Sequence, residues 1–174
     1  MKTVGDKFPK FKKQAVLANK QFGEVTEEDH KKEGKWMVMF WYPKDFTFIC
    51  PTEIVEFNKN HAKFTALNTE LYGASTDTEE VHLAWRNNDQ KLANLTFPLI
   101  SDTSKKLSKK LGILQPGKVA YRVTYIVDPE GVIQWVNANN DSTGRNIAEV
   151  LRALEATQNP GKTACDWVPG QPTL

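Results

Sequence analysis

A run of seven apolar residues, from Trp36 to Tyr42, limits the possible folds more than any other feature of the chain. The run does not alternate with polar residues, which is the pattern of a β-strand buried on both faces. It is far shorter than the roughly 20 apolar residues needed to span a membrane. A strand buried on both faces needs a covering layer on each side, and helices on both faces of a sheet provide such layers.

The flanking sequence supplies helices and further strands. Helical spacing indicates one long apolar face after residue 50 and a final helix near residue 150, and Thr76-Asp77-Thr78-Glu79 has the form of a capping box that opens a helix through Trp85. The first face contains Ile54, Phe57, Phe64, Leu67 and Leu71, and the final helix contains Ile147, Val150, Leu151 and Leu154.

Short strands are predicted at 71–75 and 97–100, and Asp102 is a candidate cap for a helix that ends at Gly112. The turn sequence 128–131 predicts a hairpin between strands 121–127 and 132–136. We therefore predict an α/β domain with a mixed central sheet flanked by helices. It occupies residues 1–158, followed by a mobile, Pro- and Gly-containing surface tail over 159–174.

Composition narrows the possible functions. The 174 residues carry a net charge of +2, which gives no support for a nucleic-acid partner or a membrane surface. The basic runs at Lys12-Lys13 and from Lys105 to Lys110 contain no interleaved aromatics, so we interpret them as solvated surface. No apolar segment of a signal peptide follows Met1, and we expect a cytoplasmic location.

The two cysteines and three scattered histidines lack metal-ligand spacing, so we expect no metal site. We expect no other cofactor.

Cys50 is the candidate nucleophile, because it lies where a loop meets the predicted start of a helix, beside Pro51. Unpaired N–H groups and the helix dipole favour an anion there, and the thiolate is the reactive form of cysteine. A lone cysteine at a helix start is more often a packing residue. The neighbours favour chemistry: the Thr47 hydroxyl is within reach of the sulfur or its target, Pro43 closes the loop, and Glu53 lies one turn later, where it could orient an arginine.

The segment Phe40-Trp41-Tyr42-Pro43-Lys44-Asp45-Phe46-Thr47-Phe48-Ile49-Cys50-Pro51-Thr52-Glu53 resembles the active-site segment of typical two-cysteine peroxiredoxins, in particular those of the alkyl hydroperoxide reductase C type. The likeness extends through Trp85, the stretch 122–131 and Gly144-Arg145 to Ala164-Cys165-Asp166-Trp167, and so covers almost the whole chain.

The resemblance implies a thioredoxin-like fold and an antioxidant peroxidase of hydrogen peroxide and organic hydroperoxides. Cys50 would be oxidised to a sulfenic acid, Thr47 and Arg122 would hold the peroxide, and Pro43 would shield the site. Glu53 and Arg145 match the supporting hydrogen-bond network of that family.

The resemblance also implies partners. Cys165 of the partner subunit in a homodimer would resolve the sulfenic acid to a disulfide, and five or six dimers would form a ring. A protein thiol would reduce the disulfide: a thioredoxin-like protein, a flavoprotein disulfide reductase or a small dedicated partner. Trp167 lies only two positions after Cys165, a spacing similar to that of a bacterial subgroup.

Two alternatives differ in their chemistry. A thioredoxin-type disulfide oxidoreductase needs Cys-x-x-Cys at the helix start, and Glu53 occupies the position of the second cysteine. An oligomeric scaffold or holdase-type chaperone of the same fold does not need Thr47, Cys50 and Arg122 together. Peroxide consumption by the wild type and by Cys50→Ser distinguishes the enzyme from the scaffold.

Overall fold

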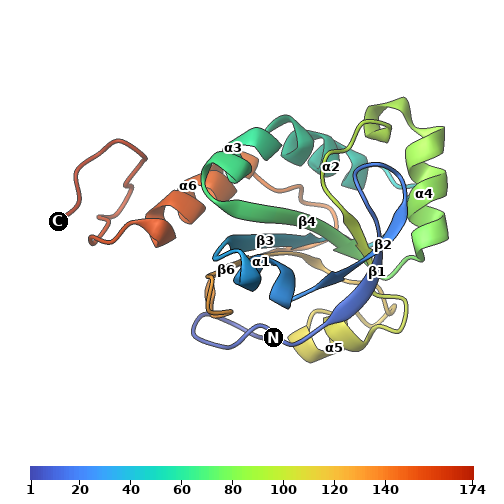
Figure 1. Ribbon diagram of the computed structural model, residues 1–174, viewed down its shortest axis with the longest axis horizontal. Coiled ribbons are helices and arrows are strands. Elements are labelled where there is room, and N and C mark those ends of the chain that lie inside the picture. The colour runs from blue at the N-terminus through green and yellow to red at the C-terminus, as the bar shows by residue number, and fades with distance from the viewer.

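A mixed seven-stranded sheet forms the centre of the protein in a computed structural model, which describes residues 1–174 (Figure 1). The strand order is β2-β1-β5-β4-β3-β6-β7. Strand β4 pairs in parallel with β3 and β5, and the other neighbouring pairs are antiparallel. The strands are β1 (Lys12–Val16), β2 (Phe22–Thr26), β3 (Trp36–Trp41), β4 (Thr69–Ser75), β5 (Leu99–Ser101), β6 (Arg122–Val127) and β7 (Ile133–Asn139).

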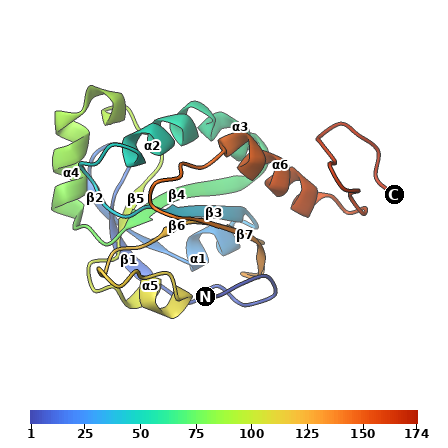
Figure 2. The same cartoon turned by 180° about the vertical axis from the view of Figure 1, so that it is seen from behind.

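Helices cover both faces of this sheet (Figures 1 and 2). Helices α2, α3, α4 and α6 pack on one face, while α1 and α5 lie on the other. The helices are α1 (Glu28–Lys32), α2 (Cys50–Lys59), α3 (His61–Ala66), α4 (Glu79–Asn88), α5 (Lys106–Leu111) and α6 (Ile147–Gln158), with a short 3₁₀ turn at Gln90–Leu92.

Strand β3 is buried on both faces, as the apolar run predicts. Met37, Met39 and Trp41 point into the core on the α5 side, whereas Val38 and Phe40 point into the core beneath α2 and α6. The two-residue period of a strand therefore divides one apolar run between two cores. Because β3 is so firmly held, the loop that follows it starts from a fixed position.

Several local predictions are confirmed. The hairpin β6–β7, the helix start at Cys50, the end of α5 at Gly112 and the final helix all occur as expected. Asp102 accepts hydrogen bonds from the backbone N–H groups of Leu107 and Ser108 in α5.

Three details differ from the sequence prediction. The apolar face after residue 50 is split between two helices by a break at Asn60 and does not extend to Leu71, which lies in the strand predicted at 71–75. Thr78, not Thr76, caps α4, because its hydroxyl accepts from the Val81 N–H. The hairpin β1–β2 was not predicted, since its strands are short and polar on one face.

The tail beyond α6 lies on the surface and projects from one end of the molecule (Figure 1). The tail does contact the domain: Trp167 is only 4% exposed, and Arg152 Nη1 in α6 donates to the Trp167 carbonyl at 3.0 Å. None of the helices is both long enough and apolar enough to cross a bilayer.

Candidate active site

The site is built at the point where β3 ends and α2 begins. Tyr42 and Pro43 are buried at the end of the strand, and the loop from Lys44 leads to Cys50, the first residue of α2. Pro51 occupies the first turn, where a missing N–H costs nothing. The structure confirms that Cys50 lies at a helix N-terminus, and its side chain is buried in the core beneath α2.

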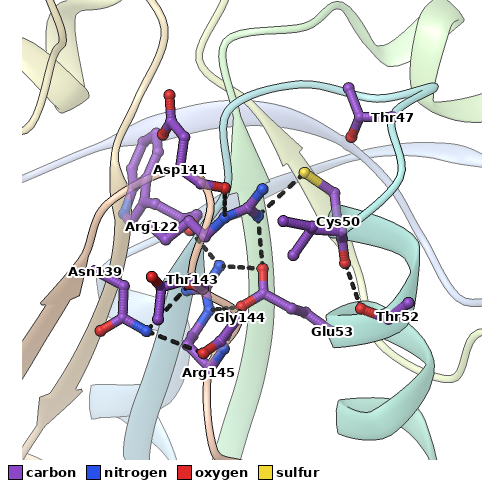
Figure 3. A network of polar contacts seen from close by, with 12 residues as sticks. Thr47, Cys50, Thr52, Glu53, Arg122, Asn139, Asp141, Thr143, Gly144 and Arg145 are labelled. Atoms are coloured by element: carbon purple, nitrogen blue, oxygen red, sulfur yellow. Dashed lines mark hydrogen bonds and ion pairs between the residues drawn. The ribbon is translucent and has the colours of Figure 1, made fainter.

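Arg122 reaches the Cys50 sulfur from the neighbouring strand. Strand β6 pairs with β3 so that Val123 lies opposite Trp41, which places Arg122 at the same end of the sheet as the loop after β3. Its Nη1 lies 3.2 Å from Cys50 Sγ and 2.7 Å from Glu53 Oε1 (Figure 3). One guanidinium nitrogen thus faces both the sulfur and a carboxylate.

Other contacts restrain the Arg122 side chain. Its Nε donates to the Asp141 carbonyl at 3.0 Å, and the side chain is 4% exposed. Burial acts to lower the pKa of Arg122, but the Cys50 sulfur and the Glu53 carboxylate outweigh burial and raise that pKa. The guanidinium is therefore a fixed positive charge beside the sulfur.

Glu53 joins two arginines in the interior. Its Oε2 accepts from Arg145 Nε at 2.7 Å and from the Arg145 backbone N–H at 2.9 Å, while Oε1 accepts from Arg122. Burial acts to raise the pKa of Glu53, but the hydrogen bonds and charge of Arg145, followed by the charge of Arg122, hold it below its ordinary value. Glu53 is accordingly an ionised anchor for Arg122, as its position one turn after Cys50 suggested.

The Arg145 side chain is buried within the same network. Its side chain is 1% exposed, and its Nη2 donates to the Trp41 carbonyl at 2.6 Å and to Glu53 Oε1 at 3.1 Å. Its Nη1 donates to the Thr124 hydroxyl at 3.1 Å, and its guanidinium carbon lies 5.3 Å from the centre of the Phe40 ring. These contacts hold the segment before α6 against β3 and β6.

Thr47 and Pro43 lie in the loop that leads to Cys50. Pro43 is buried, and Thr47 is half-buried with its hydroxyl donating to the Lys44 carbonyl at 3.0 Å. The hydroxyl oxygen keeps lone pairs for a further contact. A cavity of about 550 Å³ lies beside this loop, lined by residues that include Thr47, Phe48 and Pro51. Phe48 itself is 96% exposed.

Sequence reasoning missed a second buried network in the same loop. Asp45 accepts from the Tyr42 hydroxyl at 2.7 Å and contacts Nδ1 of His82, and the Asp45 N–H donates to Asp77 at 2.8 Å. His82 Nε2 lies 3.1 Å from the Ile100 carbonyl. The one sequence signal for this network is that Asp45 falls within the fourteen-residue segment that carries the family resemblance. Nothing in the sequence indicates a role for His82.

The second cysteine lies apart from this network. Cys165 is exposed in the tail, and both cysteines are free thiols in this chain. No group of three or more His, Cys, Asp or Glu side chains is arranged to hold a metal ion.

Comparisons with known proteins agree with the geometry. Residues 4–136 match the model of the AhpC/TSA family. Alkyl hydroperoxide reductase C of Mycobacterium tuberculosis is 43% identical over 99% of this chain and 93% of its own length. A chloroplastic 2-cysteine peroxiredoxin of Chattonella marina var. antiqua is 41% identical over 98% of this chain and 91% of its own length. The crystal structure of reduced Plasmodium vivax 2-Cys peroxiredoxin superimposes with a TM-score of 0.94 at 32% identity, and covers 99% of this chain and 93% of that one.

Proposed function

The chain belongs to the AhpC/TSA family, and we propose that it is a thiol-dependent peroxidase that reduces hydrogen peroxide and organic hydroperoxides through Cys50. The observation that carries the proposal is the position of Arg122 Nη1, which is 3.2 Å from Cys50 Sγ while bound to Glu53 at 2.7 Å. A merely structural thiol does not need a buried, carboxylate-anchored guanidinium beside it. The relatives' names point to the same chemistry, whereas nothing in them supports the scaffold alternative.

In the first step, the Cys50 thiolate attacks one oxygen of the hydroperoxide. A sulfur–oxygen bond forms, the oxygen–oxygen bond breaks, and the second oxygen leaves as hydroxide or alkoxide, which takes up a proton. Sulfur is oxidised to a sulfenic acid and the peroxide is reduced. Negative charge moves onto the departing oxygen, so donors that are already in place stabilise the transition state. The contact of Arg122 with the sulfur supports this role. The Thr47 hydroxyl would serve as a second donor after turning from the Lys44 carbonyl, to which it donates in this structure, and buried Pro43 would shield the site from water.

In the second step, we propose that the sulfenic acid condenses with Cys165 of the partner subunit, which forms a disulfide and releases water. The exposed position of Cys165 in the surface tail supports reach toward another protomer. A protein thiol then reduces the disulfide, and a thioredoxin-like protein, a flavoprotein disulfide reductase and a small dedicated partner all have suitable chemistry.

We also propose that the protein forms a homodimer and that five or six dimers assemble into a ring. We expect the protein to act in the cytoplasm. Strand β7 supports the dimer, because β7 is the last strand of the sheet and, beyond Ile133, where Gly5 and Asp6 pair with it, its outer edge has no neighbouring strand. Such an edge presents unpaired N–H and C=O groups to a second chain.

Stopped-flow measurement of peroxide consumption tests the function. The wild type should consume peroxide and form a trappable sulfenic acid, and Cys50→Ser should do neither. Cys165→Ser is the matched control, because it makes the same atomic change at the exposed cysteine. It should still form the sulfenic acid. Peroxide consumption by Cys50→Ser at the wild-type rate would refute the assignment.

A further inference from the structure

Five lysines line one pocket on the face of the molecule that carries α1 and α5. The pocket has a volume of about 610 Å³, and its lining consists of Lys2, Lys7, Lys10, Lys31 and Lys110 together with Phe8 and Pro9. This volume falls in the range of small-molecule sites, roughly 300–1,000 Å³. No carboxylate lines the pocket. In a chain whose net charge is only +2, this is a marked local concentration of positive charge.

The fold, not the sequence, gathers these lysines. Lys7 pairs with Val132 in a β-bridge, and the Phe8 N–H donates to the Gly131 carbonyl at 2.8 Å, so the N-terminal segment lies along the β6–β7 turn. The Lys2 N–H donates to the Leu111 carbonyl at 2.8 Å, which attaches the same segment to the end of α5. Figures 1 and 2 both show the N-terminus beside α5. Lysines from three separate regions thereby face one space.

Most of the charge in the pocket is not neutralised. Lys2, Lys7, Lys10 and Lys110 form no ion pair with a carboxylate, and only Lys31 lies near one, 3.7 Å from Glu28. Lys7 Nζ donates to the Glu130 backbone carbonyl at 2.7 Å. Lysines held close together repel one another, and a multiply charged anion relieves that repulsion.

The pocket is separate from the peroxidase site. Arg122 is next to Val123, which pairs with Trp41 at one end of β3, whereas the β6–β7 turn follows Val127, which pairs with Met37 at the other end. Four residue steps at about 3.3 Å per residue place the two ends of that pairing roughly 13 Å apart along the strand. A ligand in the lysine pocket therefore would not contact the Cys50 sulfur.

We propose that this pocket binds a small anion with several adjacent phosphates, such as inorganic tripolyphosphate or the triphosphate of a nucleotide. Flexible ammonium groups act as separate point charges, which suits clustered phosphate oxygens better than a single planar carboxylate. Phe8 and Pro9, the only other lining residues, have no polar side-chain group, so the charge on the ligand dominates its recognition.

Calorimetric titration of the full-length protein with tripolyphosphate tests the proposal. We expect saturable binding that weakens as salt is added, and at least about tenfold weaker binding for Lys10→Gln/Lys110→Gln. Both side chains are exposed, and neither forms an ion pair, so folding should be unaffected. The matched control is Lys63→Gln/Lys162→Gln, which removes the same charge from exposed lysines on α3 and the tail and should bind like the wild type.

Two further titrations separate the ligand classes. ATP should bind at least as tightly as tripolyphosphate, and orthophosphate at least about tenfold more weakly. Equal binding by the pocket variant and the wild type, equal weakening in the control variant, or equal affinity for orthophosphate would each overturn the proposal. So would binding of a single-stranded oligonucleotide without binding of tripolyphosphate. Peroxide consumption by the pocket variant should match the wild type, which confirms that it is folded.

Discussion

Replacement of Glu53 by Gln removes the charge that joins the two buried arginines while keeping the shape of the side chain. The wild-type carboxylate is 3% exposed and accepts from Arg122 at 2.7 Å and from Arg145 Nε at 2.7 Å. Removing one partner of a buried ion pair leaves an uncompensated charge, at a cost of about 3–5 kcal/mol in the free energy of unfolding. Gln also accepts through only one oxygen and turns an NH2 donor toward a guanidinium, so it cannot anchor Arg122 and Arg145 together as Glu53 does. A displacement of about 1 Å there would slow the reaction with peroxide about a hundredfold.

The matched control is Glu149→Gln, the same chemical change in an exposed pair. Glu149 accepts from Arg152 Nε at 2.6 Å, but its side chain is 44% exposed. Exposed pairs contribute about 0–1 kcal/mol, so this variant should be close to the wild type in stability and rate. Urea titration gives the unfolding free energies, and stopped-flow mixing with hydrogen peroxide gives the rates.

The pH dependence provides a separate check on Glu53. Its pKa is lower in the folded chain than the ordinary 4.5, so its charge contributes stability that is present above about pH 4.5. That contribution is lost as the pH falls through the folded-state pKa. The stability gap between the wild type and Glu53→Gln should therefore narrow in acid. A gap below about 1 kcal/mol at pH 7, similar to that of Glu149→Gln, would refute the anchoring role.

Three further predictions concern other parts of the site. Arg122→Gln should lower the second-order rate constant of Cys50 with peroxide by about 10²–10³-fold in stopped-flow assays, and a rate near that of the wild type would contradict its role as a donor. Cys165→Ser should turn over with dithiothreitol but not with a protein reductant, and unimpaired turnover with both would mean that another group resolves the sulfenic acid. Burial acts to lower the pKa of His82, but the hydrogen bond and charge of Asp45 outweigh burial and raise that pKa. The pair therefore contributes stability that is fully present below about pH 6.5. This stability is lost as the pH rises through the folded-state pKa of His82. His82→Gln should therefore be more destabilising near pH 6 than near pH 9 in urea titrations, and an equal effect at both would argue against a charged His82.

The sequence was sufficient to predict features that depend on local patterns. The buried strand β3, the start of α2 at Cys50 and the hairpin β6–β7 follow from residue spacing and turn chemistry. The pairing of Arg122 with Cys50 depends instead on contacts 72 positions apart in the chain, and only the family resemblance pointed to it. The partnership of Asp45 with His82 was missed for the same reason, since 37 positions separate them and neither fits a local pattern.

The lysine pocket is a second feature that the sequence alone does not predict. The lack of aromatic residues in the basic runs favours solvated surface, and Lys110 is the only residue of those runs that lines the pocket. Of the other lysines, Lys31 lies in α1 beside Lys32, and Lys2, Lys7 and Lys10 have no adjacent lysine. The β-bridge at Lys7 and the bond from Lys2 to the end of α5 hold the N-terminal segment at the pocket. Charge clusters that form by folding leave no run for sequence inspection to find.

The contacts that surround the Cys50 sulfur also restrain the residue. Cys50 is fully buried, whereas Cys165 is exposed, so the disulfide proposed between protomers would require the first turn of α2 to open. Ile54 and Phe57 are buried further along α2 and can keep the remainder of the helix in place. Oxidation itself weakens the restraint, because a neutral sulfenic acid attracts the Arg122 guanidinium less strongly than a thiolate does. Under the proposed mechanism, the site would therefore be most firmly closed before the peroxide reacts, and oxidation of the sulfur would favour the opening that exposes it to Cys165.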